Sequence, residues 1–88
     1  MAKVSGFLHL DLLRDKSVRM MFSPLNMGKN SGSRVLKDLS EAKAELLKRW
    51  NIPAARVQGA IIELQSTGHL ELAVTVEEAL IAELDRAG

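Results

Sequence analysis

The chain has 88 residues, enough for one hydrophobic core but too few for two. It contains no cysteine, which excludes disulfides, thiolate catalysis and cysteine-ligated metal clusters and fits a reducing compartment. No segment reaches the roughly 20 apolar residues of a membrane-spanning helix, and the N-terminus has no apolar run of signal-peptide type. With 47% hydrophobic and 26% charged residues, we expect one folded domain, residues 1–88, in the cytoplasm and not in a membrane.

The formal net charge is only +1, but charge is distributed unevenly along the chain. Residues 1–50 carry ten Lys or Arg against five Asp or Glu, whereas residues 51–88 carry two against six. Such asymmetry favours either a basic face that meets an anionic partner or two opposite patches that pair in an oligomer. Two solvated faces without a partner would give the same pattern.

Two alternating segments near the N-terminus predict a β-hairpin. Residues 5–13 place leucines at every second position, which is strand periodicity. Residues 14–17 are polar and of turn length, and the alternation resumes over residues 18–22. Pro24 has no N–H to donate to a neighbouring strand, so we expect the second strand to end there.

A loop followed by a long helix is predicted next. Residues 26–33 are rich in Asn, Gly and Ser, which accept unusual backbone angles. Beyond them, apolar residues recur every three to four positions at Val35, Leu39, Ala42, Leu46 and Trp50. With Ser33 as a candidate N-cap, we expect a long central helix over residues 33–50.

Residues 51–76 fit two structures. As a helix, the stripe of Val57, Ala60, Ile61 and Leu64 is closed by Gly68. As strands, residues 57–65 would form a hairpin with residues 70–76, and Gly59 in mid-segment is unfavourable to the helix. The helical spacing is the cleaner of the two.

The remaining chain completes an α+β fold. Residues 70–76 alternate and are β-branched toward their end, which predicts a strand, and the capping-box spacing from Thr75 to Glu78 opens a short C-terminal helix. The expected order is therefore an N-terminal β-hairpin, a long central helix, a second helix, a strand and a short C-terminal helix. The alternative is a four-stranded antiparallel sheet with two helices, in the order ββαββα.

One spacing pattern extends from the end of the predicted central helix into the segment after it. The pattern consists of Trp50, Asn51, Ile52, Val57, Ala60, Glu63, Leu64, Gly68, Leu70 and Glu71. In this respect residues 46–72, about a third of the chain, resemble the helix-turn-helix and first wing strand of the winged-helix superfamily. The resemblance implies that the second helix protrudes into the major groove of DNA.

Two functions follow as expectations. The first is a small nucleic-acid-binding regulator in which Arg56 and Gln58 reach bases. Phosphates would be held by Lys48, Arg49, Lys29 and Arg34, the last two flanking a loop that leads into a helix N-terminus. The alternative is a protein-interaction or adaptor domain, with a homodimer as one form, which rests on the opposite charges of the two halves of the chain.

The sequence contains no recognisable motif for catalysis or metal binding. His9 and His69 are the only histidines, each in or beside a predicted strand without a second ligand at metal spacing. No nucleophile–base order or pair of carboxylates in a glycine-bounded cleft is present in the sequence. We therefore expect a non-enzymatic protein with no catalytic residue, no metal site and no cofactor.

Overall fold

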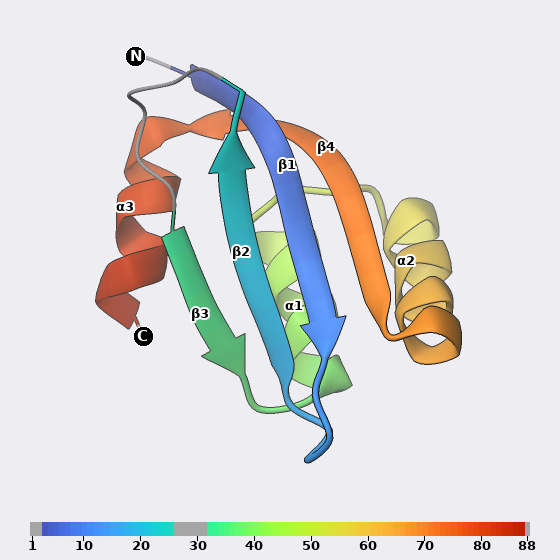
Figure 1. The fold of residues 1–88 in the computed structure, drawn as a ribbon. Coiled ribbons are helices and arrows are strands. Elements are labelled where there is room, and N and C mark those ends of the chain that lie inside the picture. Colours follow the sequence, from blue (N-terminus) through green and yellow to red (C-terminus); the bar gives the residue numbers. More distant parts are fainter. Residues whose placement is uncertain (1–2, 26–31, 88) are drawn as a thin grey trace.

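The computed structural model describes residues 3–25 and 32–87, with the backbone alone described for residues 82 and 84–87 (Figure 1). The elements in chain order are β1 (Lys3–Leu12), β2 (Val18–Pro24), β3 (Gly32–Leu36), α1 (Leu39–Lys48), α2 (Ala54–Thr67), β4 (His69–Glu77) and α3 (Glu78–Ala87). The strands form one sheet in the order β3-β2-β1-β4, with every neighbouring pair antiparallel. This is an α+β architecture of a four-stranded antiparallel sheet and three helices.

The predicted N-terminal hairpin is confirmed. β1 pairs with β2 so that Leu10 lies opposite Met20 and Leu12 opposite Val18. Lys16 in the turn has a φ of 74°, and β2 ends at Pro24, as its missing N–H requires.

The predicted long helix over residues 33–50 is wrong at its start. Residues 32–36 form strand β3, which pairs with β2, and α1 begins only at Leu39. Asp38 is the N-cap, and its carboxylate accepts a hydrogen bond from the backbone N–H of Glu41 at 3.0 Å. The predicted central helix is therefore divided into a short strand and a helix of ten residues.

The helical alternative for the next segment is confirmed, and a strand over residues 57–65 is wrong. α2 runs to Thr67 and ends at Gly68, whose φ of 81° is the left-handed cap conformation and whose N–H donates to the carbonyl of Leu64 at 2.8 Å. The strand and the short C-terminal helix that follow are also confirmed as β4 and α3. Neither predicted order is fully correct. The sheet has four strands, as in the alternative order, but three helices accompany it where the alternative order has two.

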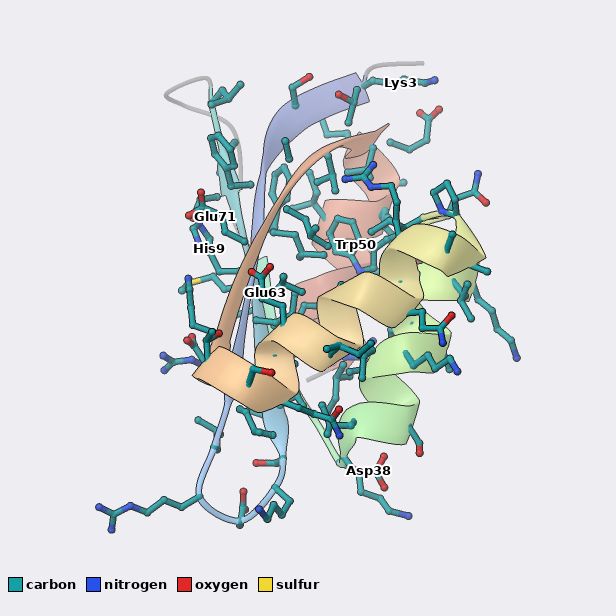
Figure 2. The ribbon with its side chains drawn as sticks, turned by 90° about the vertical axis from the view of Figure 1, so that its right-hand side faces the viewer. Lys3, His9, Asp38, Trp50, Glu63 and Glu71 are labelled. Carbon is teal, nitrogen blue, oxygen red and sulfur yellow. The ribbon has the colours of Figure 1, made fainter. Side chains whose placement is uncertain are left out.

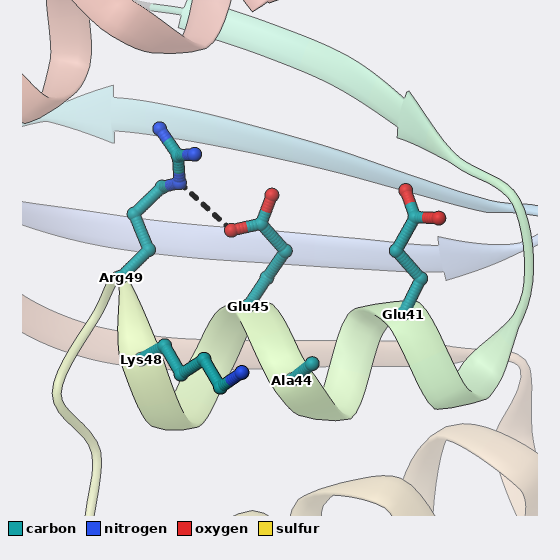
Figure 3. A pocket seen from close by; sticks show the side chains of 5 residues that line it. All are labelled: Glu41, Ala44, Glu45, Lys48 and Arg49. Carbon is teal, nitrogen blue, oxygen red and sulfur yellow. Dashed lines mark hydrogen bonds and ion pairs between the residues drawn. The ribbon is translucent and has the colours of Figure 1, made fainter.

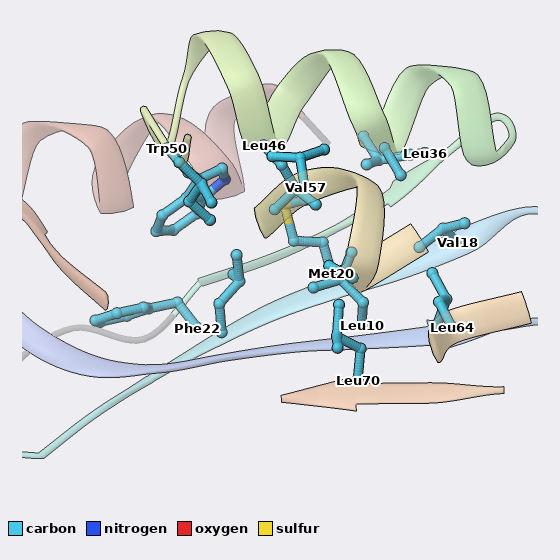
Figure 4. Close-up of a cluster of buried hydrophobic side chains, with 14 of the residues drawn as sticks. Leu10, Val18, Met20, Phe22, Leu36, Leu46, Trp50, Val57, Leu64 and Leu70 are labelled. Atoms are coloured by element: carbon cyan, nitrogen blue, oxygen red, sulfur yellow. The ribbon is translucent and has the colours of Figure 1, made fainter. Parts of the chain in front are cut away.

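The core lies between the sheet and the helices. Even-numbered residues of all four strands point toward the helices, and they meet buried side chains such as Leu46, Val57 and Leu64 (Figure 4). Trp50, only 4% exposed, stacks on Phe22 with ring centroids 5.9 Å apart. Each large aliphatic side chain buried in this way contributes about 1.5–3 kcal/mol to folding. No helix in the described ranges is long and apolar enough to cross a membrane.

Candidate functional site

Among the described residues, all three helices lie on one face of the four-stranded sheet and none lies over the other face (Figure 2). Because strand side chains alternate, the odd-numbered residues of all four strands point away from the helices. Figure 2 shows His9 and Glu71 on this side of the sheet and Trp50 on the opposite side, between the sheet and the helices. We call the surface formed by these odd-numbered strand residues the open face.

Apolar side chains cross the open face in a line. Val35 on β3 lies one row from Met21 on β2, because Val35 pairs with Arg19 and Met21 follows two residues later. Met21 in turn is diagonal to Phe7 on β1, which lies directly opposite Ala73 on β4. Val35 is 60% exposed and Met21 36% exposed. We call these four residues, Val35, Met21, Phe7 and Ala73, the apolar diagonal.

Histidines and carboxylates gather on the same face where β1 meets β4. His9 lies opposite Glu71, and Asp11 lies opposite His69 in the next row. The Nδ1 atom of His9 is 3.3 Å from a carboxylate oxygen of Glu71, and Nδ1 of His69 is 2.7 Å from Oδ1 of Asp11. The two imidazole rings are 6.1 Å apart between centroids. We call His9, Asp11, His69 and Glu71 the His–carboxylate cluster.

Asp11 is the best-connected member of this cluster. The hydrogen bond from His69 lowers the pKa of the Asp11 carboxyl, and the nearby Arg19, whose guanidinium nitrogen is 3.5 Å from Oδ2, lowers it as well. Partial burial acts in the opposite direction but is outweighed. Asp11 is therefore ionised at neutral pH, and as an acceptor-only group it requires the proton of the pair to be on Nδ1 of His69.

The sequence-based description of the two histidines as isolated is wrong. One nitrogen or oxygen from each of His9, His69 and Glu71 lies within 4.8 Å of the others. The contact depends on the pairing of β1 with β4, whose residues are about sixty positions apart in the chain. A local signal was nevertheless present, because His9 and Asp11, like His69 and Glu71, stand two positions apart and so share one face of a strand.

Two of the predicted phosphate-binding arginines are engaged within the protein. Arg34 points toward the helices and lies 2.8 Å from a carboxylate oxygen of Glu45 on α1. The other oxygen of Glu45 is 2.8 Å from Nε of Arg49, which also contacts Glu83 of α3 at 3.1 Å. These contacts join β3, α1 and α3 and leave Arg34 only 14% exposed.

The other predicted contacts are dispersed. Arg56 and Gln58 are exposed on α2, and Lys48 is exposed at the end of α1, while Lys29 lies outside the described residues. A shallow pocket of about 420 Å³ does involve two of the predicted residues (Figure 3). Its lining consists of Glu41, Ala44, Glu45, Lys48 and Arg49. Its charges are mixed, and Glu45 and Arg49 already neutralise each other there, so an anion gains little from this pocket.

No protein-family model matches the chain, and neither curated proteins nor solved structures give a match. The α+β architecture does not select a function by itself, because one fold supports many activities. Function must therefore be argued from the side chains of the open face and of the α1–α2 segment.

Proposed function

We propose that the protein is a non-catalytic interaction module that pairs with a second copy of itself through the open face of its sheet. The observation that carries this proposal is the apolar diagonal, which extends over all four strands and is not covered by a helix. A continuous apolar strip bordered by polar side chains is typical of surfaces that associate. Two antiparallel sheets commonly pack face to face with their strands nearly aligned, which would bury such a strip.

The charges of the open face support pairing with an identical copy. Among the described outward side chains, β4 carries Glu71 and Glu77 and no Lys or Arg, whereas β2 carries Arg19, which contacts Asp11 of its own chain at 3.5 Å. A two-fold axis parallel to the strands would place β4 of one copy over β3 of the other, beside Arg19. In the same arrangement the two apolar diagonals cross near Met21 and Phe7. A contact of this kind is self-complementary in both charge and hydrophobicity.

The size of the open face sets the expected affinity of self-association. Four strands about 4.8 Å apart, paired over roughly seven residues, give a face of about 19 by 24 Å in projection. Stable interfaces bury about 800 Å² on each partner, so this contact falls toward the small end. We expect self-association with a dissociation constant in the micromolar range.

Sedimentation velocity between low-micromolar and near-millimolar protein concentrations tests the proposal. Wild type should shift from monomer to dimer over this range, and Val35→Lys should remain monomeric because it places a charge in the apolar diagonal. Ile62→Lys is the matched control, since Ile62 is 57% exposed but lies on α2, away from the open face. A wild type that stays monomeric throughout, or equal effects of the two substitutions, would overturn the proposal.

Nucleic-acid binding through the α1–α2 segment is the second candidate function. It is supported by the exposure of Arg56 and Gln58 on α2 together with Lys48 at the end of α1. If residues 46–72 act as the helix-turn-helix of a winged-helix protein, these are the side chains that would meet DNA. The set is small, because Arg34 and Arg49 are held in ion pairs with Glu45.

Fluorescence anisotropy with random duplex DNA at low salt distinguishes the two candidates. Binding that weakens with added salt and with Arg56→Ala, but not with the exposed Lys43→Ala on α1, would support nucleic-acid binding. Phosphate contacts are strongest at low salt, so a failure to bind at micromolar protein would exclude this candidate.

A further inference from the structure

The His–carboxylate cluster combines the donor atoms of a transition-metal site. His9, His69 and Glu71 come from two adjacent strands, and one donor atom from each lies within 4.8 Å of the others. All three side chains are at least partly open to solvent, so an ion can reach them. Two imidazoles and a carboxylate suit zinc and its neighbours in the first transition row, whereas magnesium and calcium prefer oxygen donors alone.

Asp11 provides the outer support that metal-binding histidines usually have. Its Oδ1 lies 2.7 Å from Nδ1 of His69, and its Oδ2 is held from the β2 side by Arg19 at 3.5 Å. With Nδ1 engaged by the carboxylate of Asp11, Nε2 is the ring nitrogen of His69 that is left to bind a metal. A carboxylate that orients a histidine in this way strengthens metal binding by fixing its tautomer and ring direction.

We propose that His9, His69 and Glu71 form a binding site for one divalent transition-metal ion of the zinc type, with Asp11 orienting His69. Three protein ligands leave the fourth position of a tetrahedral zinc ion for water or another donor.

The donors need only a small movement to reach a metal. At zinc–ligand distances of about 2.0–2.1 Å, tetrahedral ligand atoms are about 3.4 Å from each other. The present spread of up to 4.8 Å therefore requires side-chain shifts of roughly 1 Å, which the half-exposed His69 and Glu71 can make by rotamer changes. The pairing of β1 with β4 holds the backbone in place during these side-chain shifts, because all three ligands belong to these two paired strands.

Titration of the full chain with Zn²⁺, followed by calorimetry and by NMR of the histidine ring protons, tests the site. We expect one zinc ion per chain, with the signals of His9 and His69 shifting together, and no effect of Mg²⁺ at the same concentration. Co²⁺ should replace zinc and give the visible absorption of a low-coordinate site. Saturable binding in which only one of the two histidines responds, or no binding at 100-fold excess zinc, would overturn the proposal.

Substitutions assign the ligands. Asp11→Asn should weaken zinc binding by about 10-fold, because the loss of an outer-shell partner usually costs 10- to 100-fold in metal affinity. His69→Gln or Glu71→Gln should weaken it by about 100-fold, because each removes a direct ligand and so costs more than the change at Asp11. Glu77→Gln is the matched control because it removes a carboxylate from the same face of β4 outside the cluster. Equal affinities of the Glu71 and Glu77 variants would overturn the ligand assignment, and circular dichroism verifies that each variant is folded.

The metal site is formed within one chain, but it lies on the open face that the proposed dimer would cover, so zinc binding is compared at low-micromolar protein, where wild type is expected to be monomeric. Val35 lies on β3, two strands away from β1, so the Val35→Lys variant should bind zinc with the affinity of the wild type. Loss of zinc binding in this variant would contradict a site formed within one chain. Failure of wild type to form dimers, in contrast, leaves the expected zinc affinity unchanged, so the two proposals fail by different observations.

Discussion

Arg34 on β3 and Glu45 on α1 form an ion pair at 2.8 Å beneath the helices, with only 14% and 13% of their side chains exposed. Glu45 also lies 2.8 Å from Arg49 at the end of α1, so one carboxylate contacts two guanidinium groups. Removing one partner from a largely buried ion pair costs more than the pair itself contributes, because a charge is left without a partner. The packing of α1 against β3 therefore depends on Glu45.

Glu45→Gln should lower the free energy of unfolding by about 2–4 kcal/mol, because the largely buried Arg34 loses its carboxylate and Arg49 keeps only the exposed Glu83. Urea unfolding followed by the fluorescence of Trp50, the sole tryptophan, measures this directly. Lys43→Gln, an exposed change on the same helix, should stay within about 0.5 kcal/mol of wild type. If the two variants unfold at the same urea concentration, the ion pair has no structural importance.

Asp38→Ala should destabilise the protein by about 1 kcal/mol, because the backbone N–H of Glu41 loses its hydrogen-bond acceptor at the start of α1. Asp38→Asn keeps an acceptor at the same position and should retain most of the wild-type stability. Thermal unfolding of the three proteins provides the comparison. A loss as large for the asparagine variant as for the alanine variant would show that the negative charge matters instead of the cap.

The elements that were predicted correctly are those whose pattern is local. The hairpin of β1 and β2 follows from alternation on both sides of a polar turn, and α2 follows from its stripe together with the Gly68 stop. The start of α1 was missed because Val35 and Leu39 are spaced four apart, which continues the helical stripe backward through β3. The capping residue Asp38, three positions before Glu41, was the overlooked signal.

The His–carboxylate cluster could not be predicted with the same means. Each half of the cluster is visible in one strand, as His9 with Asp11 and as His69 with Glu71. Bringing the halves together requires both the pairing of β1 with β4 and its register, and a shift by one residue would send one half to the core side. Long-range strand order is set by tertiary packing, so it is absent from any single segment of the sequence.

Gly6→Ala and Gly59→Ala should change stability in opposite directions. A Cβ at position 6 would clash with the carbonyl oxygen of Ser23 and lie 2.8 Å from Cα of Pro24, so the β1–β2 pairing must distort. We expect a loss of about 3 kcal/mol. A Cβ at position 59 meets nothing within 4 Å on α2, and alanine should there gain up to about 1 kcal/mol.

Urea unfolding of both glycine variants measures these changes against wild type. Gly59→Ala serves as the control for adding a methyl group, since it differs from Gly6→Ala in its surroundings and not in its chemistry. A neutral Gly6→Ala would mean that β1 and β2 do not approach each other closely at the Gly6–Pro24 pair.

The β1–β2 turn should make a pH-dependent contribution to stability through Asp15. Hydrogen bonds from the hydroxyl and the backbone N–H of Ser17, the latter at 3.0 Å, lower the pKa of the Asp15 carboxyl below its usual 3.8. Because the folded pKa is the lower one, the stabilisation is complete above the unfolded value of 3.8 and is lost as pH falls through the folded value.

The stability difference between wild type and Asp15→Asn should accordingly shrink as pH falls from 5 to 2, because a protonated Asp15 no longer prefers the folded turn. An NMR titration of the Asp15 carboxyl carbon gives the folded pKa directly. Ser17→Ala should move that pKa upward toward 3.8 without reaching it, since the backbone N–H at position 17 still donates. A stability difference that stays constant over this pH range would mean that the Ser17 hydrogen bonds do not favour the charged form of Asp15.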